Sequence, residues 1–228
     1  MWITRSPRTA IRRSRLTFPE QQAADLDRSA RSLSRILQAT ISLYREIGHG
    51  KTTVADVARR CAMSPANIYR FFRSKRHIEE AVVAELLEQV FEEATNAATC
   101  SGSPVDRLEA VLRTISRLHE VRFANDNRLH DLVAVAGDAG WPVVLSHVDR
   151  VVGLLAPIIS AGQARGDIRD GSAARLAHCL LAAMNAHVSA RQGSAFAVRP
   201  NFEEMIDFCI NSLGQTRCRT GRHSAGQG

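Results

Sequence analysis

Apolar residues recur every three to four positions along most of the 228-residue chain, which is the spacing of amphipathic helices. No segment shows the sustained alternation of apolar and polar residues that indicates a strand. We therefore predict an all-α fold. Glycines and prolines separate the predicted helices, which cover about 30–47, 53–62, 65–71, 74–99, 104–121, 125–137, 142–165, 172–190 and 201–214.

Three helix-start signals follow one another closely in the first third of the chain. Thr53 precedes an apolar-periodic run and has Asp56 three residues later, which is a capping-box pattern. Ser64-Pro65 combines a favourable N-cap with proline at the first helical position, and Ser74 opens the next helix. Two short helices joined by a tight turn and braced by a longer preceding helix predict a helix-turn-helix, whose helices are too short to be stable alone.

These patterns divide the chain into four parts. Residues 29–78 form the predicted three-helix helix-turn-helix domain, and residues 79–214 form a larger helical domain. Residues 1–28 hold five arginines before the first acid and are expected to be a flexible basic arm. Such an arm either reaches a DNA minor groove or is a dispensable extension. The polar tail 215–228 is expected to be disordered.

Charge is divided unevenly between these parts. Residues 1–76 carry 16 Lys and Arg against 5 Asp and Glu, whereas residues 77–214 carry 11 against 18. The last 14 residues add three arginines and no acid, and the whole chain has a net charge of +7. A basic N-terminal third on an acidic body implies a polyanionic partner for the first part only.

Other classes of protein find little support. The longest apolar run, 151–162, is too short for a bilayer, and the N-terminus lacks the apolar core of a secretory signal. Five scattered cysteines without a CxxC pair favour a reducing cytoplasm. We find no nucleophile-elbow, dinucleotide-binding, P-loop or paired-carboxylate motif, so we predict neither an enzyme nor a bound cofactor. The spacing of the histidines does not match a metal site, and core or pocket-wall histidines are commoner.

At the helix-turn-helix the sequence resembles the TetR family of bacterial transcriptional regulators. The matching pattern is Thr53-x4-Ala58 followed by SPANIYRFFxSK from Ser64 to Lys75, within a resemblance that covers about residues 30–80. One departure is Ala62-Met63, where the family usually has a glycine before the hydrophobic residue. Alanine fits that turn if its φ stays negative. The resemblance implies an N-terminal DNA-binding domain and a C-terminal half that holds an effector pocket and a dimer interface.

The predicted DNA contacts lie in and around the second short helix. They are Thr53, Ser64, Pro65, Ala66, Asn67, Tyr69, Arg70 and Lys75. Lys75 lies in the first turn of a helix, where the macrodipole disfavours a cation unless a phosphate binds there. Asn67 and Arg70 have the side chains that pair with adenine and guanine, and Ala66 can meet a thymine methyl. Tyr69 is either a core aromatic or, by the resemblance, a phosphate donor.

The resemblance also implies sites in the C-terminal half. The predicted walls of the effector pocket are His119, Phe123, Trp141, Val144, His147 and Leu155. Small residues at close helical intervals after residue 176 suggest close approach of two helices, although ordinary core burial would also explain them. The predicted dimer-interface residues are Leu180, Ala183, Met184, Ile206, Ile210 and Leu213.

The function implied is that of a homodimeric, cytoplasmic repressor. It would bind double-stranded operator DNA and be released by a small-molecule effector whose identity the sequence does not reveal. The alternative is a DNA-binding structural protein of the same fold that has no effector. A solid core in the C-terminal half would favour the alternative, and a cavity would favour the repressor.

Overall fold

The computed structural model describes residues 18–188 and 200–214, which form ten α-helices and no strand. The all-α prediction is therefore confirmed for this part of the chain. The helices are α1 (Phe18–Ile47), α2 (Val54–Arg60), α3 (Pro65–Tyr69), α4 (Lys75–Ala98), α5 (Pro104–Asn125), α6 (Asn127–Asp138), α7 (Pro142–Arg165), α8 (Ala173–Ala183), α9 (Asn185–Val188) and α10 (Phe202–Leu213).

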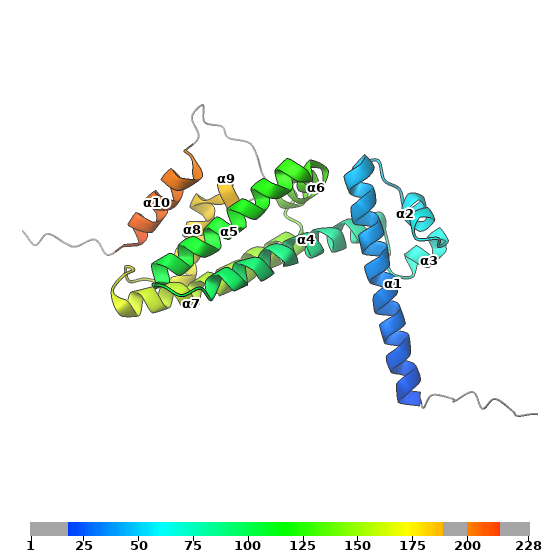
Figure 1. The fold of residues 1–228 in the computed structure, drawn as a ribbon, viewed down its shortest axis with the longest axis horizontal. Coiled ribbons are helices and arrows are strands. Elements are labelled where there is room, and N and C mark those ends of the chain that lie inside the picture. The colour runs from blue at the N-terminus through cyan, green and yellow to red at the C-terminus, as the bar shows by residue number, and fades with distance from the viewer. Residues whose placement is uncertain (1–17, 189–199, 215–228) are drawn as a thin grey trace, which may run out of the picture.

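Two groups of helices lie at opposite ends of α4 (Figure 1). The head consists of α1, α2, α3 and the start of α4, and its core includes Ile36, Ile68 and Phe72. The body consists of α5 to α10 packed around the rest of α4, and α7 lies against α4, α5 and α8. By length and composition α7 could also cross a membrane, a test that core helices pass as well.

Helix α4 belongs to every core cluster of the structure. Ile78 in its second turn lies in the head core, and Val82 and Leu86 lie in a second cluster with α1 and α6. Val90 and Ala94, farther along, lie in the core of the body. The boundary predicted between residues 78 and 79 thus falls within one continuous helix, which couples head and body mechanically.

The three predicted helix starts in the head are all present. Thr53 and Asp56 form the reciprocal capping box, in which the Asp56 N–H donates to the Thr53 hydroxyl. Ser64 caps α3 and Ser74 caps α4 in the same way, by accepting from the N–H three residues later. These bonds satisfy backbone donors at helix starts that would otherwise have no partner. They explain why helices of only five and seven residues form here.

The first helix begins much earlier than the sequence indicated. Residues 18–28, predicted to belong to a flexible arm, continue α1 without a break and project beyond the head (Figure 1). Ion pairs between Asp25 and Arg28 and between Asp27 and Arg31 stabilise this exposed stretch at helical spacing. The sequence signal was weak here, because Leu26, which is 67% exposed, is accompanied at helical spacing only by alanines and by Leu33. Residues 1–17 lie outside the described residues.

The C-terminal helices differ from their predicted bounds in one respect. The helix predicted over 172–190 is divided at Met184 into α8 and the short α9. The last helix, α10, ends at Leu213, and Gly214 then forms an isolated antiparallel bridge with Ile168. The tail predicted over 215–228 lies outside the described residues.

Candidate functional site

Helix α3 presents one face to the core of the head and another to solvent. Ile68 is fully buried and Phe72 nearly so, whereas the side chain of Tyr69 is 50% exposed. The core interpretation of Tyr69 is therefore wrong, and its hydroxyl is free to meet a partner. Ser64, Pro65, Ala66 and Arg70 are also exposed. Ser64, Pro65 and Ala66 lie at the start of α3 and Tyr69 and Arg70 at its end, so these side chains can contact a groove without disturbing the core.

The exposed surface of α3 is basic and has no acid of its own. No Asp or Glu occurs between Asp56 and Glu79. Arg70 donates only to the Asn67 side chain, at 3.4 Å, so both groups remain available to a ligand. Among the described residues neither Arg70 nor Arg73 forms an ion pair. The surface therefore attracts anions.

Lys75 has internal partners that the sequence did not reveal. Its Nζ donates to the carbonyl oxygen of His49 at 2.7 Å and lies 3.6 Å from a carboxylate oxygen of Glu79. Glu79 also lies 3.7 Å from Nδ1 of His49, so this group ties the loop before α2 to the start of α4. A structural role accounts for a cation at this helix start, and the phosphate contact of Lys75 stays a prediction.

The turn between α2 and α3 has an unexpected conformation. Ala62 adopts a φ of 51°, in the left-handed region, so the negative φ under which we expected alanine to fit the turn is not found. The turn is closed by bonds from the Ala62 N–H to the Arg59 carbonyl and from the Met63 N–H to the Ala58 carbonyl, at 3.1 and 2.9 Å. These bonds, together with burial of Cys61 on one side and capping by Ser64 on the other, stabilise this backbone conformation.

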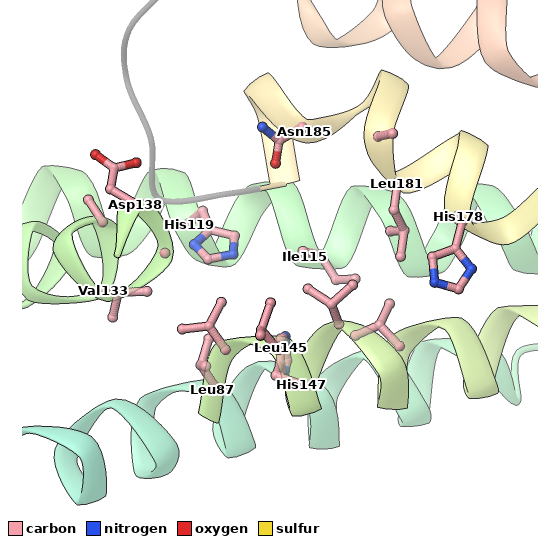
Figure 2. A pocket seen from close by; sticks show the side chains of 16 residues that line it. Leu87, Ile115, His119, Val133, Asp138, Leu145, His147, His178, Leu181 and Asn185 are labelled. Atoms are coloured by element: carbon pink, nitrogen blue, oxygen red, sulfur yellow. The ribbon is translucent and has the colours of Figure 1, made fainter. Parts of the chain in front are cut away.

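A cavity of about 400 Å³ lies in the body, between α4, α5, α6, α7, α8 and α9 (Figure 2). Most of its wall is aliphatic, with polar groups from three histidines, one aspartate and one asparagine. The lining residues are Leu87, Ile115, His119, Val133, Ala134, Gly137, Asp138, Val144, Leu145, His147, Val148, Val151, His178, Leu181, Ala182 and Asn185.

Two of the lining histidines are uncharged at neutral pH. Burial and, to a smaller extent, the nearby charge of Arg122 lower the pKa of His119 to about 3. Burial also lowers the pKa of His147 to about 4, helped by the charge of Arg150. Both side chains therefore act as neutral hydrogen-bonding groups in the wall of the cavity.

Two family models match the chain. Residues 36–82 match "Bacterial regulatory proteins, tetR family", and residues 104–204 match "Tetracyclin repressor-like, C-terminal domain". The matches cover both the head and the body and together span more than half of the chain. The chain belongs to the TetR family. This family consists of transcription regulators rather than enzymes.

Individual proteins that the chain resembles share at most moderate sequence identity with it. The HTH-type transcriptional regulator BetI of Escherichia coli (strain K12 / DH10B) is 30% identical over 80 residues, which are 34% of this chain and 41% of BetI. The match thus spans about two fifths of that relative. RolR with resorcinol aligns at a TM-score of 0.61 and 13% identity, over 84% of this chain and 91% of RolR. AibR with isovaleryl coenzyme A and operator DNA aligns at a TM-score of 0.53 and 17% identity, over 80% of this chain and 98% of AibR. Both structures share the TetR fold.

The structure places the residues that we predicted for the effector pocket in different positions. His119, Val144 and His147 line the cavity, whereas Trp141 and Leu155 do not. Leu155 lies on the same face of α7 as the lining residue Val151, one turn farther along, where it is fully buried in the core of the body. The side chain of Phe123 lies outside the described residues.

Trp141 instead joins the head to the body of this TetR-family protein. It is buried in the cluster between α1, α4 and α6, at the residue that precedes α7. The guanidinium of Arg76, in the first turn of α4, stacks over its ring at 3.2 Å and also pairs with Glu80 at 3.0 Å. A cation–π contact of this kind stabilises the position of α7 relative to the start of α4.

The predicted dimer interface needs a similar correction. Leu180, Met184, Ile206 and Leu213 are buried in the protomer's own core, so their side chains are not available to a partner. The apolar periodicity of α8 and α10 therefore marks their inward faces. Ile210 is half-buried against the same core, and Ala183 is exposed, so for these two residues the interface stays a prediction.

Two exposed residues were missing from the predicted sites. Arg73 follows α3 and has no acid three or four residues away, a signal that the sequence does contain. Phe208, on α10, is 66% exposed, although its sequence context resembles that of a core residue. In the described part of the chain, no group of three potential metal ligands comes together.

Proposed function

We propose that this protein is a homodimeric transcriptional repressor that binds operator DNA through its head and is released by a small molecule bound in its body. The observation that carries the proposal is the exposed, acid-free surface of α3, with Asn67, Tyr69, Arg70 and Arg73 around it. Family membership supports the same function. BetI, a transcriptional regulator, and AibR, which was solved in complex with operator DNA, are consistent with it.

Different parts of this surface would contact the phosphates and the bases of the DNA. Arg73 and the hydroxyl of Tyr69 lie after the middle of α3 and would contact phosphates, which position the protein without distinguishing sequences. Asn67 and Arg70 would contact base edges in the major groove, each worth about 1–3 kcal/mol of discrimination. Ser64, Pro65 and Ala66 would bring the start of α3 close to the groove, and Thr53 would bring the start of α2 close to the backbone.

The cavity supports a response to a ligand. Leu87 of α4 lines the cavity, and α4 runs directly from there to the head. Five residues in the first half of α7 also line it, and α7 starts beside the Arg76–Trp141 stack. A ligand that binds better when α7 and α4 are displaced would shift the head. The affinity for DNA would then fall by at most the ratio of the ligand's affinities for the displaced and the undisplaced conformations.

A second copy of the chain would complete the DNA-binding unit, because a two-fold dimer can contact two half-sites in successive major grooves. We place the interface on the outer faces of α8 and α10, around Ala183 and the exposed Phe208. Phe208→Glu would place a charge in this apolar contact, and analytical ultracentrifugation should then find monomers at concentrations at which the wild type is dimeric. An unchanged dimer would place the interface elsewhere.

DNA binding is tested with the full chain and the DNA upstream of its own gene. Affinity is measured from about 50 to 200 mM salt, since each phosphate contact contributes about one unit to the slope of log affinity against log salt. Arg73→Ala should weaken binding to every sequence and reduce this slope. Asn67→Ala should instead change the preference for particular bases while leaving the slope unchanged.

Arg175→Ala is the matched control for this experiment. Arg175 is an exposed arginine on α8, in the body, so its loss removes the same charge far from the head. Equal losses from Arg73→Ala and Arg175→Ala would show that only net charge matters and would contradict the proposed surface. If genome-wide selection of bound fragments also finds no specific site, DNA recognition by the head is wrong.

A further inference from the structure

The cavity contains two imidazole groups with unused hydrogen-bonding capacity. His119, on α5, is only 5% exposed, and His147, on α7, is half-buried on the opposite wall (Figure 2). In the described part of the chain, Nδ1 of either side chain is buried and has no hydrogen-bond partner. Because each Nδ1 is buried, a molecule in the cavity meets the other edge of the ring, at Nε2, and the unpartnered Nδ1 leaves the tautomer of each ring free to suit that molecule.

The protonation of these groups restricts what can supply the bond. With pKa values lowered to about 3 and about 4, His119 and His147 are both neutral at pH 7. A neutral imidazole offers either an N–H or a lone pair at Nε2, depending on its tautomer. A hydroxyl group both donates and accepts, so it can satisfy either tautomer. A carboxylate satisfies only the N–H form, and an ammonium group satisfies only the other.

The charges around the two histidines also argue against charged ligands. Besides burial, the charge of Arg122 lowers the pKa of His119, whereas at His147 the effect of Arg150 is opposed by Glu88, so a cation is disfavoured chiefly beside His119. Arg150 is already paired with Glu88, and neither arginine lines the cavity, so no cation is placed to pair directly with a bound anion. The remaining polar side chains, those of Asp138, His178 and Asn185, are exposed.

The volume of the cavity and the side chains of its wall limit the size and the polarity of a ligand. An apolar cavity of about 150 Å³ holds one benzene ring, so about 400 Å³ admits a molecule of one or two rings with short substituents. The aliphatic side chains of the wall favour a hydrophobic body for such a molecule.

We infer that the cavity takes an uncharged, mainly hydrophobic molecule of one or two rings, whose hydroxyl group forms hydrogen bonds with His119 and His147. This inference rests on the proposed function, because it treats the cavity as the effector site. It adds the chemical class of the effector, and it identifies the two side chains that select it.

The test uses two matched sets of probes with the full chain. The one-ring set is 4-propylphenol, propylbenzene, 4-propylbenzoate and 4-propylbenzylamine, and the two-ring set is 2-naphthol, naphthalene, 2-naphthoate and 2-naphthylmethylamine. Within a set the ring body is constant, and only the polar group changes. Calorimetric titration at pH 7 should give the hydroxylated member of at least one set an affinity at least about tenfold above each of its analogues.

Variants then locate the bond. His119→Leu and His147→Leu should each reduce the affinity for the hydroxylated probe about tenfold or more and leave the affinity for the plain hydrocarbon equal or higher. Retained hydrocarbon binding shows that the variant is folded. His178→Leu, at an exposed lining residue, is the control and should change the affinity for the hydroxylated probe less than about twofold.

Three results would overturn the inference. They are tightest binding of a charged member, no advantage of the hydroxylated member in either set, and an advantage that survives both histidine substitutions. Absence of binding by all eight probes counts as the second result. The DNA-binding measurements decide the proposed function separately, because a protein that binds operator DNA but prefers no hydroxylated probe would refute only this inference.

Discussion

Replacement of Ala62 by glycine should stabilise the protein, although it removes a side-chain atom. Ala62 is exposed, and its φ of 51° lies in the left-handed region that glycine adopts freely. Because its methyl group is not packed in the core, the substitution creates no cavity. The change therefore tests the backbone conformation of the turn between α2 and α3, with almost no contribution from packing.

Two opposing terms set the magnitude. An L-residue pays about 1–2 kcal/mol in the left-handed region, and glycine does not. Glycine has more freedom in the unfolded chain, which offsets about 0.5–1 kcal/mol of this gain. The net increase in the free energy of unfolding is about 1 kcal/mol. For a chain of this size, that corresponds to a rise in Tm of about 2–4 °C.

Thermal and urea unfolding of Ala62→Gly and wild type would measure this difference. Ala55→Gly is the control, because Ala55 is also exposed and differs chiefly in lying inside α2 with helical backbone angles. There the same atomic change should destabilise the protein by about 1 kcal/mol. If both substitutions lower the stability equally, Ala62 does not have a positive φ, and the turn geometry described above is wrong.

Two further predictions concern the body of the protein. Below about pH 6.5 the unfolded chain binds protons at His119 and His147 and the folded chain does not, so the free energy of unfolding should fall by about 1.2 kcal/mol for each histidine between pH 6 and 5. Urea unfolding of the wild type and of the His119→Leu/His147→Leu double variant would measure this fall, and an equal dependence on pH in both proteins would contradict it. Gly162→Ala should cost about 1–3 kcal/mol in the same assay, because its Cβ would lie 2.5 Å from Cδ1 of Ile168. Gly153→Ala, in the same helix with no atom within 4 Å of the new Cβ, should be neutral or stabilising by up to about 1 kcal/mol, and a loss at both positions would point to a general effect of alanine in α7.

The local architecture of the head was predictable because the interactions that define it join residues close in sequence. Thr53, Ser64 and Ser74 each bond to the N–H three residues later, so their roles follow from the residue types and the spacing alone. The same reasoning failed at Ala62. Alanine does not itself favour a positive φ, and the turn obtains that conformation from the bonds and packing on both sides of it.

Side chains whose partners are distant in sequence were less predictable. A helical pattern identifies the apolar face of a helix but does not say whether that face meets the core, a cavity or another subunit. Leu155 and His147 both lie on α7, yet one is buried in the core and the other lines the cavity. Leu180 and Met184 had the pattern expected of an interface, and they pack inside the protomer.

The sequence by itself determined the helices, the capped turns of the head and the basic surface of α3. All of these depend on propensity, on charge or on contacts within a few residues. Tertiary structure alone decided that Lys75 bonds to His49, 26 residues away, and that Trp141 stacks on Arg76 rather than facing a ligand. It also brought His119 and His147 to one cavity, because relations across the fold arise only when separate helices pack, and packing depends on all their side chains together.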